Sequence, residues 1–148
     1  MHLTSPAFQN NDDIPIRYGR KFDDINPPLE FSEIPPDAES LVLIMDDPDA
    51  PGGVFTHWVI FNIPPAATHL GEDEIPAEAV EGINDYGRKG YGGPKPPNGT
   101  HRYVFKLYAL DALLELQPEV NSEDLYEAME GHVITKAKLT GLYSADES

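Results

Sequence analysis

Cysteine is absent from this chain of 148 residues, and so is any apolar run approaching the roughly 18 residues of a membrane-spanning helix. Disulfide bridges and cysteine-based zinc or redox sites are therefore excluded, and stability has to come from packing. The first residues also lack the basic segment and the following apolar segment of a secretory signal. These absences together predict a cytoplasmic protein with no integral membrane association.

Positive charge is scarce, because 10 Lys and Arg residues stand against 26 Asp and Glu residues, a formal net charge of −16. Such a surface repels phosphate backbones and anionic lipid headgroups at long range. We therefore expect no nucleic-acid partner. The acidic excess is typical of an ordinary soluble surface and also of proteins from a high-salt cytoplasm, and the composition leaves both explanations open.

Helix signals are few, whereas turn-forming residues are common. The 15 Pro and 12 Gly residues lie between apolar runs, a pattern that favours many turns over disorder. Segments rich in β-branched and aromatic residues predict four strands, at 41–45, 57–63, 101–110 and 133–143. A weaker candidate strand covers 14–22, and the Pro- and Glu-rich segments 26–36 and 64–78 are expected to be loops.

One helix is predicted, over residues 122–130. Ser122 suits the N-cap, and Gly131 follows the last turn as a stop. Its apolar stripe would consist of Leu125, Ala128 and Met129. Since the chain has no internal repeat and no linker, these elements predict one mainly β domain that spans residues 1–148.

Three carboxylates crowd into the turn that follows the strand at 41–45, namely Asp46, Asp47 and Asp49. Prolines and glycines at 48–53 enforce a sharp exit from the strand. Like charges this close raise one another's pKa values unless a cation or a hydrogen-bond donor lies nearby. The aspartates either accept backbone N–H bonds within the turn or contribute to a site, and their spacing alone leaves both open.

A histidine begins the strand at 57–63. Strict alternation places His57 on the same face as Val59 and Phe61. A histidine on a core-facing side is more often a packed, hydrogen-bonded residue than a ligand contact. His57 taken by itself therefore does not predict a site.

The segment 91–105 joins a Gly- and Pro-rich loop to the start of a strand. Glycine lets a ligand approach the backbone, proline stiffens the loop, and Asn98-Gly99 is a strong turn signal. A period of two then places His101 and Tyr103 on one face of the strand and Arg102 on the other. An imidazole and a phenol thus converge, and Arg102 is the expected counter-ion of one of the aspartates.

Several catalytic and cofactor motifs are missing. The glycines at 87–93 lack the lysine and hydroxyl residue of a phosphate-binding loop. No two of the five histidines have i,i+2 or i,i+4 spacing, so a metal site would need a carboxylate from another strand. No G-x-S-x-G elbow is present, and no serine lies in the histidine-bearing segments. We expect no metal, no cofactor and no enzymatic activity, although acid/base chemistry by Asp47 and a histidine stays open.

Taken together, the segments 26–31, 41–51, 57–59 and 90–105 resemble the phosphatidylethanolamine-binding protein family, in its bacterial and archaeal branch called Raf kinase inhibitor-like. The most specific blocks are Asp-Pro-Asp-Ala-Pro at 47–51 and the Gly-Pro and His-Arg-Tyr elements within 93–103. The resemblance covers nearly the whole chain. It implies a β-sandwich-like fold with a large central sheet, a smaller sheet and one or two short helices.

The resemblance also implies a pocket for phosphate-like anions. Its polar residues would be Asp47, His57, His101 and Tyr103, and its lining would include Ala50, Pro51, Gly93 and Pro94. Neutral or protonated imidazoles, the phenol and backbone N–H groups beside the glycines would donate to the anion, while Asp47 orients a histidine by accepting its other N–H. Because protonated histidine binds anions better, affinity should rise as the pH falls toward about 6.

Two features depart from the eukaryotic members. The sequence ends soon after the last predicted strand, so their C-terminal helix is not expected here. Phe55 stands where their pocket often carries tryptophan. A more open pocket and weaker lipid specificity follow as expectations.

Three functions remain open. The first is a binding or regulatory protein whose pocket takes a phosphorylated small molecule or a phosphorylated side chain of a partner. The second, as in some relatives, is an inhibitor of a kinase or serine protease that acts through surface loops such as 64–78. The third is an unassigned hydrolase or lyase that uses the two histidines. The family branch also includes dimers, so a homodimer is left open as well.

Overall fold

The computed structural model describes residues 1–145, which form two antiparallel β-sheets and one α-helix. The large sheet has the strand order β6 (Val80–Glu81), β4 (Phe55–Ile63), β3 (Ser40–Asp47), β7 (Thr100–Leu110) and β8 (Val133–Ser144). The small sheet has the order β1 (His2–Thr4), β2 (Leu29–Ser32) and β5 (His69–Leu70). The expected mainly β architecture with a large and a small sheet is confirmed.

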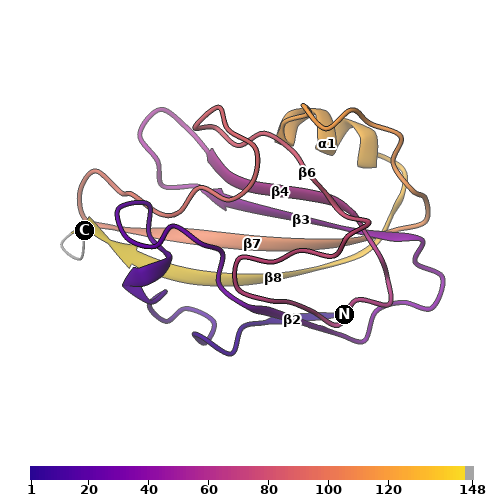
Figure 1. Cartoon of the computed structure of the whole chain (residues 1–148), viewed down its shortest axis with the longest axis horizontal. Coiled ribbons are helices and arrows are strands. Elements are labelled where there is room, and N and C mark those ends of the chain that lie inside the picture. The colour runs from indigo at the N-terminus through magenta and orange to yellow at the C-terminus, as the bar shows by residue number, and fades with distance from the viewer. Residues whose placement is uncertain (146–148) are drawn as a thin grey trace.

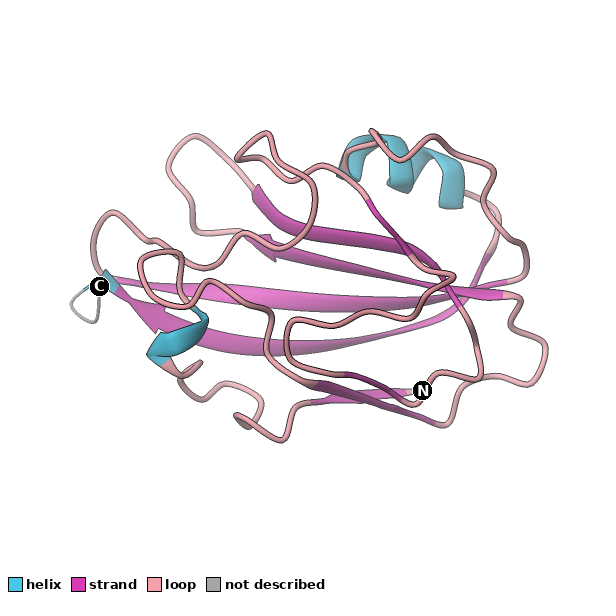
Figure 2. Ribbon diagram, viewed as in Figure 1, coloured by secondary structure: helices cyan, strands magenta, loops and turns pink. Residues whose placement is uncertain are grey.

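The large sheet is covered on both faces. In Figure 1 the helix α1 (Ser122–Met129) lies on one side of this sheet and β2 of the small sheet lies on the other. Loops make up most of the remaining chain (Figure 2), as expected from the many prolines and glycines. No helix within residues 1–145 is long and apolar enough to cross a membrane.

The central strand β3 is buried along its whole length. Leu41, Leu43 and Met45 face the small sheet, where they join one apolar core. Val42 and Ile44 face the helix side and join a second core with Leu125 and Met129 of α1. Because both faces of β3 are covered, its sequence is continuously apolar instead of alternating. The continuous run therefore marks the middle of the molecule.

The four strands predicted most clearly are all present, each within two residues of its expected bounds. The weaker strand at 14–22 is wrong. Its middle forms a 3-10 helix at Ile16–Tyr18, and Pro15, which introduces that turn, accepts the Tyr18 N–H at 3.1 Å. Just before this segment, Asp13 makes an isolated β-bridge to Leu142 of β8. Pro15 thus favours a turn where apolar content suggested a strand.

The two expected loops each contain a short strand. Within 26–36, β2 alternates buried Leu29 and Phe31 with exposed residues, and within 64–78, β5 pairs with β2. Both strands are too short to stand out from their Pro-rich surroundings. Their pairing is tertiary, since β2 joins β1 and β5, which lie far away in sequence.

The helix is confirmed, but its cap is not the expected residue. Asn121 is the N-cap: its Oδ1 accepts the Asp124 N–H at 2.9 Å, and the Asp124 carboxylate accepts the Asn121 N–H at 3.2 Å. This reciprocal capping box satisfies two backbone N–H groups, whereas the side chain of a serine N-cap would satisfy only one. Ser122 instead contacts Thr56 Oγ1 of β4 through its hydroxyl, at 2.9 Å.

Candidate functional site

A cavity of about 180 Å³ opens where the end of β3 meets the starts of β4 and β7. Two loops close around it, the turn after β3 and the Gly- and Pro-rich segment before β7. The residues that line it are Asp47, Ala50, Pro51, Phe55, His57, Tyr86, Lys95, Pro97, His101 and Tyr103. Six of the eight residues expected at the site are therefore brought together here.

A β-bulge aims His57 into this cavity. Asp46 pairs with Thr56 and Met45 pairs with Trp58, so His57 has no partner on β3. The extra residue breaks the alternation, and His57 lies 5.2 Å from the Tyr103 ring, whereas Val59 belongs to the core on the opposite face. The predicted face was wrong: strict alternation placed His57 with Val59 and Phe61.

His57 is fixed by the loop that precedes β7. Its Nδ1 lies 2.6 Å from the carbonyl oxygen of Gly92, which can only accept a hydrogen bond, so Nδ1 carries a proton. The Gly92 N–H in turn donates to the His57 carbonyl at 2.9 Å. A Cβ at Gly92 would overlap the Tyr86 ring, which explains the glycine. Burial lowers the pKa of His57, and the Gly92 carbonyl and the Asp47 charge only partly offset this.

His101 is held by the expected aspartate. Its Nδ1 lies 2.6 Å from Asp47 Oδ2, and both side chains are buried. The other carboxylate oxygen, Oδ1, accepts the Asp49 N–H at 2.8 Å. Asp47 therefore orients His101 while staying bound to its own turn, in agreement with the predicted role.

Tyr103 lies between the two histidines. Its ring makes an edge contact with His57 at 5.2 Å and a stacked contact with His101 at 6.5 Å. Its hydroxyl is buried and has no hydrogen-bond partner within the described residues. Burial, reinforced by the Asp47 charge, raises the pKa of Tyr103, and the Lys95 backbone only partly offsets this, so the phenol keeps its proton. Asp47 and the Lys95 backbone are thus polar neighbours of the hydroxyl, but it forms a full hydrogen bond with neither and remains an available donor.

Gly93 and Pro94 do not line the cavity. They lie behind it, where the Gly93 carbonyl accepts the Tyr86 hydroxyl at 2.9 Å and the Pro94 carbonyl accepts the Arg20 N–H at 3.0 Å. Phe55, which the resemblance had placed at a pocket position, also lines the cavity, and the lining residues that the sequence did not indicate are Tyr86, Lys95 and Pro97. Lys95 and Pro97 belong to the Gly- and Pro-rich segment, which could have indicated them. Nothing in the local sequence marks Tyr86.

The predicted ion pair of Arg102 is present. Its guanidinium binds both oxygens of Asp49, at 3.0 and 2.8 Å, and its backbone N–H donates to the same carboxylate at 2.9 Å. These hydrogen bonds lower the pKa of Asp49 to about 2. Neither residue of this pair lines the cavity.

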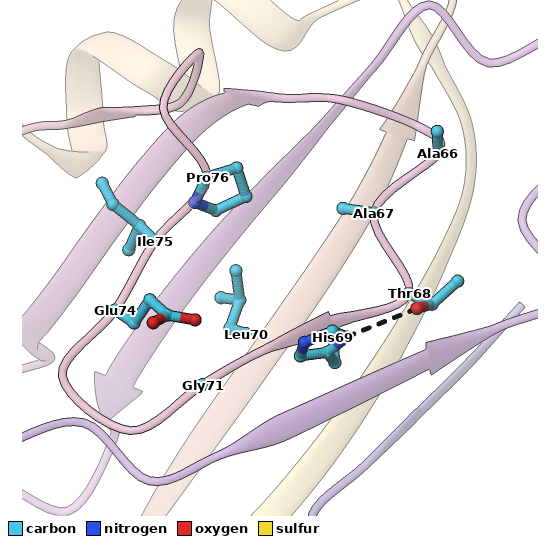
Figure 3. A pocket seen from close by; sticks show the side chains of 9 residues that line it. All are labelled: Ala66, Ala67, Thr68, His69, Leu70, Gly71, Glu74, Ile75 and Pro76. Carbon is cyan, nitrogen blue, oxygen red and sulfur yellow. Dashed lines mark hydrogen bonds between the residues drawn. The ribbon is translucent and has the colours of Figure 1, made fainter.

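Larger hollows lie elsewhere in the described residues, but their chemistry is poorer. Loop 66–76 surrounds one of about 330 Å³, and Figure 3 shows apolar Leu70, Ile75 and Pro76 around it with Glu74 and His69. Another, of about 470 Å³, lies beside α1 on the opposite face of the large sheet. There Asp46 is already paired with Lys106 and Tyr126. Of these hollows within residues 1–145, the small cavity alone combines two buried imidazoles with an unpaired buried hydroxyl.

Known proteins resemble this chain over nearly its whole length. A UPF0098 protein from Methanothermobacter thermautotrophicus is 53% identical over 148 residues, which cover 97% of this chain and 98% of that protein. The crystal structure of the putative phosphatidylethanolamine-binding protein homologue CT736 from Chlamydia trachomatis superposes with a TM-score of 0.93, at 43% identity, covering 97% of this chain and 96% of that one. Escherichia coli YbcL, described as a new member of the mammalian PEBP family, gives 0.91 at 28% identity and covers 97% of each chain.

The sequence model of one family, described as phosphatidylethanolamine-binding protein, matches residues 4–144. That match includes both sheets almost completely, the helix, and every residue that lines the small cavity. The chain therefore belongs to the phosphatidylethanolamine-binding protein family.

Proposed function

We propose that the cavity binds a phosphate-like anion, free or as a phosphorylated group, and that the chain acts as a binding or regulatory protein. The Tyr103 hydroxyl carries this proposal, because it is buried between two imidazoles without a partner in the described residues. An unsatisfied buried hydroxyl costs about 1–3 kcal/mol, and a ligand oxygen that accepted from it would recover that cost. Lys95 on the cavity wall adds a positive charge for an anion.

Replacing Tyr103 with phenylalanine tests the proposal. The Tyr103→Phe variant should bind inorganic phosphate about tenfold more weakly, a loss of about 1.4 kcal/mol, because one donor is gone. Without ligand it should be at least as stable as the parent protein, since the hydroxyl that is removed made no hydrogen bond. Isothermal titration calorimetry and urea unfolding measure the two quantities.

Tyr143→Phe is the matched control. Tyr143 is also buried and contacts the Tyr103 ring, but its hydroxyl donates to the Ile16 carbonyl at 2.9 Å. This variant should lose about 1 kcal/mol of stability and keep its phosphate affinity. Equal affinities for the parent protein and Tyr103→Phe would refute the role given to the hydroxyl, and no phosphate binding by the parent protein would refute the proposed function.

Inhibition of a kinase or serine protease is the second candidate, supported by the hollow in loop 66–76, within the segment 64–78. His57→Ala/His101→Ala disables the pocket, and His69→Ala/Glu74→Ala alters the loop. Inhibition that is lost only in the loop variant would support this candidate, whereas loss only in the pocket variant would link inhibition to anion binding.

Turnover that vanishes with the two histidines would instead indicate acid/base catalysis. A cytoplasmic location and a homodimer stay predictions, which cell fractionation and light scattering would test.

A further inference from the structure

The proton positions of the two histidines restrict which anions the cavity can hold. His57 uses Nδ1–H toward the Gly92 carbonyl, and His101 uses Nδ1–H toward the Asp47 carboxylate. A neutral imidazole has only one N–H, so in the neutral form each Nε2 is an acceptor. The expectation that neutral imidazoles donate to an anion is therefore wrong for both residues. They can donate through Nε2 only when they are protonated.

Protonation of His57 is opposed by its surroundings. Burial lowers its pKa, with only partial compensation from the Gly92 carbonyl and from Asp47 on β3. From β7 it faces Tyr103, and from the preceding loop it faces Tyr86, both of which remain neutral phenols because burial raises their pKa values. Near neutral pH, the wall around His57 therefore offers a hydrogen-bond acceptor in a place where an anion would need a donor.

From these observations we infer that the site selects oxyanions that carry a proton of their own, such as inorganic phosphate or a singly protonated phosphate monoester, over oxyanions that carry none. This rests on the proposed function. The ligand O–H donates to Nε2 of His57, while its other oxygens accept from Tyr103 and pair with Lys95. An oxyanion without a proton would place its lone pairs against the lone pair of Nε2. To bind, it would require the imidazole to take up a proton from solvent.

Four ligands of similar size test the inference. At about pH 8 inorganic phosphate still carries one proton, methyl phosphate has lost its last proton because monoesters titrate near pH 6, and sulfate has none. Calorimetry at that pH should give phosphate at least about tenfold tighter binding than sulfate, although both are tetrahedral dianions. Methyl phosphate should resemble sulfate near pH 8 and approach phosphate at about pH 5.5. Dimethyl phosphate, a diester like a phospholipid headgroup, should bind as weakly as sulfate.

Proton counting gives an independent readout. In two buffers with different ionisation enthalpies, methyl phosphate at about pH 8 should bind with uptake of close to one proton, and inorganic phosphate with almost none. In the parent protein, long-range ¹H–¹⁵N spectra should show Nε2 of His57 without a proton. A protonated Nε2 on a neutral ring would overturn the inference.

His57→Gln supplies an amide N–H near the position of Nε2 and does not titrate. It should reduce the preference for phosphate over sulfate at least about fivefold and abolish the proton uptake. His132→Gln is the control, since His132 also pairs through Nδ1 with an aspartate, Asp111 at 2.8 Å, but on the exposed surface. Equal binding of phosphate and sulfate by the parent protein would overturn the proton selection and leave anion binding intact. Failure of all four ligands would instead refute the proposed function.

Discussion

Two adjacent carboxylates on β3 differ in what compensates their charge. Asp46 and Asp47 are equally buried, at 3% exposure each, but their side chains make contacts on opposite sides of the large sheet. Asp46 accepts from Lys106 at 2.9 Å, from Thr56 at 3.0 Å and from the Tyr126 hydroxyl at 3.2 Å. Asp47 accepts from the His101 ring and from a backbone N–H.

The difference separates a structural carboxylate from one that serves a site. Lysine is charged at neutral pH, so the charge of Asp46 is compensated by the protein. Burial, reinforced by the Asp46 charge, raises the pKa of Tyr126, so its hydroxyl keeps its proton and donates to Asp46. The partner of Asp47 is instead the imidazole of His101, which lines the small cavity. Asp46 is thus compensated by a lysine, whereas Asp47 holds a side chain of the proposed site.

The largest expected effect comes from breaking the Asp46 pair. Lys106→Met should lower the free energy of unfolding by about 3 kcal/mol, because it leaves a buried carboxylate without its cation. Phosphate affinity at the opposite face should be unchanged. Urea unfolding and calorimetry measure both, with Lys138→Met as control, since exposed Lys138 lies opposite Lys106 in the strand register. A large loss of phosphate affinity in Lys106→Met would show that the two faces are coupled.

Asp47→Asn should lower phosphate affinity strongly and stability only weakly, the opposite of Lys106→Met. Without the carboxylate, His101 loses the acceptor that sets its orientation, so phosphate affinity should fall about tenfold, or about 1.4 kcal/mol. The loss of stability should be clearly smaller than in Lys106→Met. Asp111→Asn, which removes the carboxylate of the exposed His132 pair, should change neither quantity. Tighter phosphate binding in Asp47→Asn would mean that Asp47 mainly repels the anion.

Just below neutral pH, the pH dependence of stability should come from His57, on the Asp47 side of the sheet. His57 has a lowered pKa in the folded state, so the unfolded state binds more protons once the pH falls below the unfolded value near 6.5. The contribution of His57 is fully present above that pH and is lost as the pH falls, with a slope of up to about 1.4 kcal/mol per pH unit. Urea unfolding at several pH values should show a shallower slope for His57→Gln and an unchanged slope for His132→Gln.

The smallest effect is expected for the third carboxylate of the turn. Asp49 pairs with Arg102 at the surface, so Arg102→Ala should change stability far less than Lys106→Met, and salt should erase the difference. The pKa of Asp49 is lowered to about 2, so its contribution is present above the unfolded pKa near 4 and is lost as the pH falls toward 2. A loss of stability in Arg102→Ala that does not depend on salt would show that this pair contributes more than an exposed ion pair does.

Much of the site could be predicted because its residues cluster in two short segments. Asp47, Ala50 and Pro51 come from one turn, and His101 and Tyr103 alternate on one strand, so spacing and resemblance together identify them. Tyr86 could not be found in this way, because its ring reaches the cavity from a loop whose sequence carries no motif. Gly93 and Pro94 belong to the right segment but lie behind the cavity wall.

Local patterns are enough to predict four of the five strands of the large sheet, the helix and the residue types available to the site. These patterns are the apolar run of β3, the alternation in β7 and the turn residues between them. The face on which His57 lies depends instead on tertiary pairing, because a bulge is set by how β4 pairs with β3. The tertiary structure also decides which ring nitrogen carries the proton, since the Gly92 carbonyl and the Asp47 carboxylate reach the two imidazoles from other segments of the chain.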